Sequence, residues 1–110
     1  MQISVKTANE VQILVFEGKL DTQTSPDAQQ LFSRLIGEGQ NRFLVNFEKL
    51  SYISSAGLRV LLAAAKQLNG LDGELRICSL NEVVTEVFDI SGFTTIFKVF
   101  GSESEALDGY

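Results

Sequence analysis

The sequence has no histidine, and it has only one cysteine and one proline. Without histidine the chain cannot supply a Ser–His or Cys–His catalytic pair or a histidine-ligated zinc ion. A Ser–Lys pair is disfavoured, because Lys49 is predicted in a loop and Lys66 on the solvent side of a helix. Cys78 cannot form an intramolecular disulfide, and it lies in a predicted strand, where a buried structural thiol is expected. We therefore expect no enzyme.

Long apolar runs are also missing. No run approaches the roughly 20 residues that a membrane span needs. The first residues lack the basic-then-apolar layout of a signal peptide, so we expect a cytoplasmic protein. The net charge of −5, with Glu103, Glu105 and Asp108 near the end of the chain, disfavours nucleic acid and anionic membranes as partners. With 110 residues and 45% hydrophobic residues, we expect one compact domain over residues 1–110 that is a monomer when free.

The first half of the chain predicts a hairpin followed by a helix. Apolar residues alternate on both sides of residues 7–10: Ile3, Val5, Val11, Ile13 and Val15. Residues 19–26 are polar and turn-like, and Ser25, Pro26 and Asp27 supply an N-cap, a first-turn proline and an early acid. An apolar stripe follows at helical spacing, formed by Ala28, Leu31, Phe32, Leu35 and Ile36. Gly37 and Gly39 should end this helix.

The second half predicts alternating strands and helices. Residues 42–47 read as a strand covered on both faces, and residues 74–79 as the next strand. The helix between them has an apolar stripe, formed by Leu58, Leu61, Leu62, Ala65 and Leu68. A third helix is capped either by Ser79 with Glu82 or by Asn81, and closed by Gly92. Its apolar side is formed by Val83, Val84, Val87 and Phe88.

A last short strand is predicted within residues 93–100 and a terminal helix within 102–110. The elements together predict a single α/β domain. It has a mixed four- to five-stranded sheet, about four helices, and an N-terminal hairpin followed by βαβ crossovers.

Two adjacent serines stand where the strand after residue 42 gives way to a helix. Ser54 and Ser55 therefore lie at the carboxyl edge of the sheet, where open α/β sheets present their sites. A helix start offers unpaired N–H groups and a positive dipole, so a phosphate on serine is tolerated there. Capping alone would account for one serine, but small Ala56 and Gly57 also leave the backbone open to close approach. The pattern suggests a regulatory switch.

The segment 50-LSYISSAGLRVLLAA-64 resembles the signature of the STAS family, in particular stand-alone bacterial anti-sigma factor antagonists. Supporting matches are 18-GKLDTQTSP-26, 43-FLVNFEKL-50 and 80-LNEVVTEVFDISGF-93, all in the family's order and spacing. The resemblance covers nearly the whole chain, and it implies the STAS fold.

The resemblance also implies a phosphorylation site and a mechanism. In that family the acceptor serine lies two residues before the glycine, which is Ser55 here. The family often has aspartate at the preceding position, where this chain has Ser54 as a second candidate. The unmodified protein would bind an anti-sigma factor that is also a serine kinase of the histidine-kinase-like ATPase class, and so release the sigma factor. Phosphorylation would inactivate it, and a metal-dependent serine/threonine phosphatase would reverse this. Nucleotide and metal would belong to those partners, and the chain would hold no cofactor.

We expect the partner-binding residues to surround the acceptor. They are Asp21, Thr22, Thr24, Ser54, Ser55, Ala56, Gly57, Leu58 and Arg59. From the residues alone, Leu58 fits the core as well as an interface, Arg59 fits a solvated side chain, and Asp21 fits a turn cap.

Two other functions stay open at this point. One is an unphosphorylated STAS subunit of a membrane transporter complex. The other is a sensor of a small anionic ligand, although the spacing Gly-x4-Gly-Lys-Ser/Thr is absent.

Overall fold

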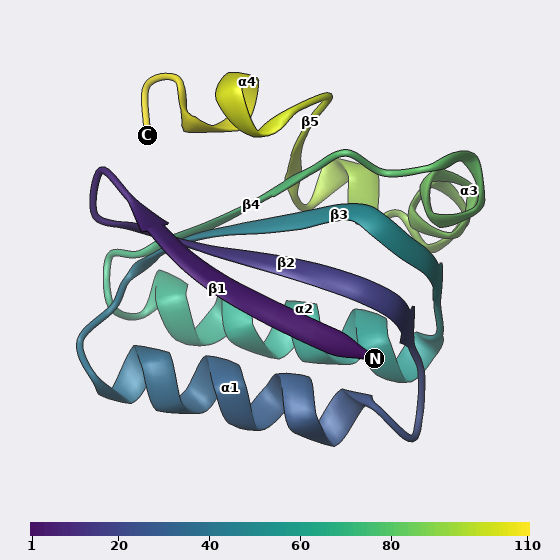
Figure 1. The fold of residues 1–110 in the computed structure, drawn as a ribbon, viewed down its shortest axis with the longest axis horizontal. Coiled ribbons are helices and arrows are strands. Elements are labelled where there is room, and N and C mark those ends of the chain that lie inside the picture. The colour runs from purple at the N-terminus through teal and green to yellow at the C-terminus, as the bar shows by residue number, and fades with distance from the viewer.

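Five strands form one mixed sheet in the order β1-β2-β3-β4-β5 in the computed structural model, which describes residues 1–110 (Figure 1). β1 is antiparallel to β2, and the other three neighbouring pairs are parallel. The strands are β1 (Gln2–Ala8), β2 (Val11–Leu20), β3 (Arg42–Ile53), β4 (Glu74–Cys78) and β5 (Lys98–Phe100). The predicted hairpin and βαβ crossovers are confirmed.

Four α-helices accompany the sheet. They are α1 (Ser25–Gly37), α2 (Ser55–Asn69), α3 (Glu82–Ser91) and α4 (Glu103–Leu107), and a 3-10 turn, η1 (Phe93–Thr95), precedes β5. α1 and α2 run side by side across one face of the sheet, while α4 lies over the opposite face (Figure 1). α3 packs beside the far end of β3. None of the helices is both long and apolar enough to cross a membrane.

The main core lies between the sheet and the pair α1 and α2. Side chains of a strand alternate between its faces, so β3 sends Phe43, Val45 and Phe47 toward the helices. Phe47 is fully buried and makes edge-on contacts with Phe16 and Phe88, with ring centroids 5.4 and 6.4 Å apart. A smaller cluster lies on the other face beneath α4, and it is formed by Val11, Ile13, Leu44, Cys78 and Ala106. The buried thiol predicted at Cys78 is confirmed.

The central strands β2 and β3 are longer than the sequence predicts. Their parallel pairing continues past two irregularities to the pair Leu20 and Ile53. Both of these side chains are buried, and so is Leu50. These three apolar side chains pack this end of the sheet into the core. The prediction that Lys49 lies in a loop is therefore wrong, because Lys49 pairs with Glu17 within the sheet. Residues 19 and 20 likewise belong to β2 and not to the turn.

Two helix starts also differ from the prediction. α1 begins at Ser25 with Thr24 as its N-cap residue, because Ser25 is already hydrogen-bonded back to Asp21 as the first helical residue. α3 is capped by Asn81, whose side chain accepts a hydrogen bond from the N–H of Val84 at 2.8 Å. Ser79 cannot cap α3, because it is in a left-handed turn with φ +65° just after β4 ends.

The apolar side predicted for α3 is confirmed only in part. Val84 and Phe88 are fully buried, and Val87 is half-buried. Val83, however, is 51% exposed, so the side of α3 that reaches the core is narrower than predicted. Gly92 closes the helix as predicted, in the left-handed conformation at φ +80°.

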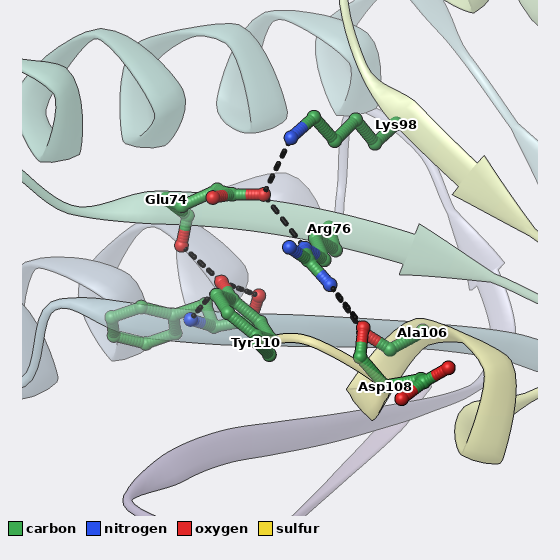
Figure 2. A network of polar contacts seen from close by, with 7 residues as sticks. Glu74, Arg76, Lys98, Ala106, Asp108 and Tyr110 are labelled. Carbon is green, nitrogen blue, oxygen red and sulfur yellow. Dashed lines mark hydrogen bonds and ion pairs between the residues drawn. The ribbon is translucent and has the colours of Figure 1, made fainter.

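Residues 106–110 fasten α4 to the sheet (Figure 2). The Tyr110 hydroxyl accepts a hydrogen bond from the N–H of Phe43 at 3.0 Å, and it lies 2.6 Å from the carbonyl oxygen of Glu74. The guanidinium of Arg76 donates to the carbonyl oxygens of Ala106 and Asp108, which would otherwise lack partners at the end of α4. It also lies 4.2 Å from the centroid of the Tyr110 ring. This network holds α4 over the second apolar cluster.

Candidate functional site

The carboxyl ends of β2 and β3 lie next to each other and bring two loops together. The N–H of Ser54 donates a hydrogen bond to the carbonyl oxygen of Leu20 at 2.9 Å. The turn from Asp21 to Thr24, which follows Leu20, therefore lies beside the start of α2. The structure thus brings the predicted site residues from the two segments together at one edge of the sheet (Figure 1).

Ser54 is the N-cap of α2. Its backbone is extended, with φ −97° and ψ 174°, and its hydroxyl accepts a hydrogen bond from the N–H of Gly57 at 3.4 Å. Its carbonyl oxygen accepts from the N–H of Leu58 at 3.0 Å. The half-buried side chain of Ser54 is thus occupied in capping the N-terminus of α2.

Ser55 is the first residue of α2, and its situation is different. Its side chain is exposed, and its hydroxyl takes part in none of the side-chain hydrogen bonds of the protein. Of the N–H groups in the first turn of α2, that of Gly57 is capped by Ser54, and the N–H groups of Ser55 and Ala56 have no partners within the helix. Of the two serines, Ser55 presents the free nucleophile.

Gly57 is required by packing. A Cβ atom at this position would lie 2.8 Å from the side chains of Ile53 and Leu20, and 2.9 Å from the carbonyl oxygen of Leu20. Real Cβ contacts are not this short, so only glycine allows the first turn of α2 to sit against the end of β2. The close approach predicted at Gly57 therefore occurs within the protein, between the start of α2 and the ends of β2 and β3.

The turn after β2 is built around the carboxylate of Asp21. One oxygen of this carboxylate accepts hydrogen bonds from the N–H groups of Thr24 and Gln23, at 3.1 and 3.0 Å. The hydrogen bond from Thr24 is the main reason why the pKa of Asp21 lies below its usual value. The Thr24 hydroxyl accepts from the N–H of Asp21 and lies 2.9 Å from the carbonyl oxygen of Lys19. These contacts give Asp21 the role of a turn cap.

The remaining predicted residues divide between surface and core. Thr22 and Arg59 are exposed, and Ala56 is half-buried. Leu58 is only 7% exposed and packs in the main core, so it supports the start of the helix and offers little surface to a partner.

A groove runs between the N-terminal halves of α1 and α2, directly beside these residues. It has a volume of about 350 Å³. Pro26, Gln29, Val60 and Ala63 line it, and the sequence reasoning did not include them. Spacing could have indicated the two on α2, because positions four and seven residues after Ala56 share its helical face.

A larger cavity, of about 640 Å³, lies away from the serines on the α4 side of the sheet. Two of its charged groups pair with each other, since Glu103 lies 3.0 Å from Lys6, and Glu103 also accepts a hydrogen bond from Asn46. We therefore regard the serine edge, with its free hydroxyl, as the candidate site. No group of three or more His, Cys, Asp or Glu side chains is placed to hold a metal ion.

The fold and the site define a single α/β domain that presents one exposed serine hydroxyl at the start of a helix. The sequence model of the STAS domain matches residues 2–106. The chain belongs to the STAS family.

Two relatives extend the match over nearly the full length of both chains. BtrV of Bordetella bronchiseptica, described as a candidate anti-sigma factor antagonist, is 36% identical over 106 residues, covering 96% of this chain and 91% of BtrV. The anti-sigma F factor antagonist of Paenibacillus polymyxa is 30% identical and covers 97% of this chain and 92% of its own.

Solved structures share the fold. A candidate anti-sigma factor antagonist from Thermotoga maritima superposes with a TM-score of 0.92 at 22% identity, over 96% of this chain and 92% of its own. SpoIIAA of Bacillus in its phosphorylated form superposes with a TM-score of 0.77 at 23% identity, over 97% of each chain. At these identities the likeness shows the fold alone. It agrees with the STAS-like architecture predicted from the sequence.

Proposed function

We propose that this chain is an anti-sigma factor antagonist that works by partner switching. The unmodified protein binds an anti-sigma factor that is also a serine kinase, and this binding releases the sigma factor. The kinase then phosphorylates Ser55, which ends the binding, and a serine/threonine phosphatase restores the unmodified protein. The names of the two full-length relatives support this class of function.

The observation that carries the proposal is the different state of the two serines. The hydroxyl oxygen of Ser54 already accepts the hydrogen bond from Gly57 that caps α2, so a phosphate on Ser54 would alter a contact inside the protein. The exposed hydroxyl of Ser55 can be modified with no loss of a contact inside the protein. A reversible switch needs a residue whose modification leaves the fold intact, and Ser55 meets this requirement.

The electrostatics of the site support a change in binding and not in folding. A phosphoserine carries about −1.5 to −2 charges at pH 7. At a helix start the dipole stabilises such an anion by roughly 0.3–1 kcal/mol. Enclosing the same charge without a partner in a protein interface costs several kcal/mol. A phosphate on Ser55 therefore leaves the free protein folded and destabilises the complex.

The proposed contact surface consists of the exposed groups around Ser55. Thr22 and Arg59 flank it, and Asp21, Thr24 and Ala56 contribute the parts of their surfaces that are not buried. Gly57 and Leu58 act from beneath, by holding α2 against β2.

The chain is the substrate in this cycle, not an enzyme. The nucleotide and the metal ions belong to the kinase and the phosphatase, so the chain requires no cofactor of its own. These partners act in the cytoplasm, which is where we place the chain. We also propose that it is a monomer when it is not bound to a partner.

The test is phosphopeptide mapping of the protein isolated from its own cells. Trypsin cleaves after Lys49 and Arg59 and releases residues 50–59 as one peptide. This peptide contains Ser51, Tyr52, Ser54 and Ser55, so fragmentation must separate the four hydroxyls, and Ser51 serves as an internal control. We expect phosphate on Ser55 in an amount that changes with growth condition. No phosphate under any condition, together with co-purifying subunits of a membrane transporter, would contradict the proposal and favour the transporter-subunit function.

A further inference from the structure

Arg59 is an exposed arginine without a charged partner. All three ion pairs of the molecule centre on Glu74 or Glu103, and none of them includes Arg59. Its guanidinium takes part in none of the side-chain hydrogen bonds either. Arginine presents five N–H donors in a fixed planar fork, which matches the two oxygens of a carboxylate or of a phosphate. Arg59 therefore has its whole binding capacity available.

This arginine lines the groove between α1 and α2. Small side chains keep the groove open on the α2 side, where Ala56 and Ala63 face it. It continues along the helices into a narrower cavity of about 50 Å³, which Gln29, Val60 and Ala63 also line. Arg59 is the only charged residue among those that line either cavity. The groove thus offers one unpaired positive charge at the end nearest the acceptor serine.

Arg59 also lies within reach of the Ser55 hydroxyl. Residues four positions apart on a helix share one face, with Cβ atoms about 5–6 Å apart. A phosphate on Ser55 would extend from this face and offer its oxygens to the guanidinium. The same arginine can therefore bind an anionic group in the groove or a phosphate on its own helix, and the two anions compete for its charge and its N–H donors.

We propose that the groove binds an Asp- or Glu-bearing segment of the protein partner through Arg59, and that phosphorylation of Ser55 withdraws Arg59 from that segment. The inference rests on the proposed function, because it concerns the same acceptor serine and the same partner. Charge complementarity selects the occupant, since the groove has an unpaired cation and no acidic side chain in its lining. Arg59 therefore determines which partner segment binds, and it is also the residue with which the phosphate pairs.

The first test uses the isolated protein with phosphoserine incorporated at position 55. The second pKa of the phosphate is followed by phosphorus NMR in the wild type and in Arg59→Ala. Loss of the pairing should raise this pKa by roughly 0.15–0.4 unit, as the strength of helical pairs four residues apart suggests. Arg34→Ala, which removes an exposed arginine of α1 outside the groove, should leave it unchanged. An identical titration in Arg59→Ala and the wild type would contradict the proposal that the phosphate on Ser55 pairs with Arg59.

The second test measures affinity for the purified kinase that phosphorylates the chain. Arg59→Ala should weaken binding of the unmodified protein by roughly 10- to 100-fold, Arg59→Lys by less, and Arg34→Ala should have no effect. The loss of affinity caused by phosphorylation should be smaller in Arg59→Ala than in the wild type. If the two losses are equal, phosphate does not act through Arg59 and the inference is wrong. If the wild type binds no anti-sigma factor, the proposed function fails, while the phosphorus titration still decides whether Arg59 holds the phosphate.

Discussion

Gly57 lies against Leu20 so closely that a Cβ atom on Gly57 would come within 2.8 Å of the Leu20 side chain and 2.9 Å of its carbonyl oxygen. This contact joins the start of α2 to the end of β2, and with it the acceptor segment to the turn that begins at Asp21. The surface around Ser55 therefore depends on a residue that has no side chain.

The first prediction concerns this contact. Gly57→Ala should lower the free energy of unfolding by roughly 1–3 kcal/mol, the usual cost of forcing extra volume into a packed site. Gly37→Ala is the matched control, because no atom lies within 4 Å of the Cβ that it would add at the end of α1. The control should be neutral or gain about 0.4–1 kcal/mol, since it only reduces the freedom of the unfolded chain. Urea unfolding of both variants measures the difference, and equal stabilities would contradict the packing role.

The second prediction separates the two serines by stability. Ser54→Ala should lower the free energy of unfolding by about 1 kcal/mol, because it removes the side chain that caps α2. Ser55→Ala should change it by less than about 0.5 kcal/mol, as expected for an exposed residue whose hydroxyl has no partner. Denaturant titration of the two variants is the measurement. A larger loss in Ser55→Ala than in Ser54→Ala would reverse the roles assigned to the two hydroxyls.

The third prediction separates the same residues by binding. Ser55→Ala should keep the affinity of the unmodified protein for the anti-sigma factor and make the binding insensitive to the kinase. Ser55→Asp should bind at least about tenfold more weakly, because it places an unpaired charge in the interface. Isothermal titration with the purified partner checks both variants. Equal affinities for Ser55→Ala and Ser55→Asp would show that position 55 is not enclosed by the partner.

Much of the fold was predictable, because the periodicity of the apolar residues is strong in the elements that build the main core. The stripe from Ala28 to Ile36 repeats at helical spacing, and four of its five residues are buried in α1. The ends of the strands were less predictable. Lys49 was predicted in a loop, yet it pairs with Glu17 across β2 and β3, because Leu50 and Ile53 are buried beyond it. Local polarity cannot reveal that a strand continues as long as alternate positions reach the core.

The candidate site was likewise predictable only in part. The position of Ser54 and Ser55 at the carboxyl edge follows from the strand-to-helix pattern alone. Which hydroxyl is free depends on the backbone of Ser54, whose extended conformation turns its side chain onto the helix. The groove was not predictable either, since it requires α1 and α2 to lie side by side, and sequence spacing does not fix the distance between two helices.

The fourth prediction concerns the C-terminal network around Tyr110. Tyr110→Phe should lower the free energy of unfolding by roughly 1–3 kcal/mol, because the N–H of Phe43 loses the hydroxyl that accepts its hydrogen bond. Tyr52→Phe is the matched control, since Tyr52 is 42% exposed and lies far along β3 from this network. Urea unfolding at neutral pH measures both variants, and similar losses would contradict the role of the hydroxyl.

The same phenol makes stability depend on alkaline pH in a direction that can be worked out. Burial is the main reason why the pKa of Tyr110 is raised from 10.0 to about 12. A group whose pKa is higher in the folded protein contributes its stabilisation fully below the unfolded value and loses it as pH rises through the folded value. The wild type and Tyr52→Phe should therefore lose stability between about pH 10 and pH 12 by an amount that Tyr110→Phe does not lose. Unfolding curves across this range provide the measurement. Parallel losses in all three proteins would show that the phenol of Tyr110 is not held in its protonated form by the fold.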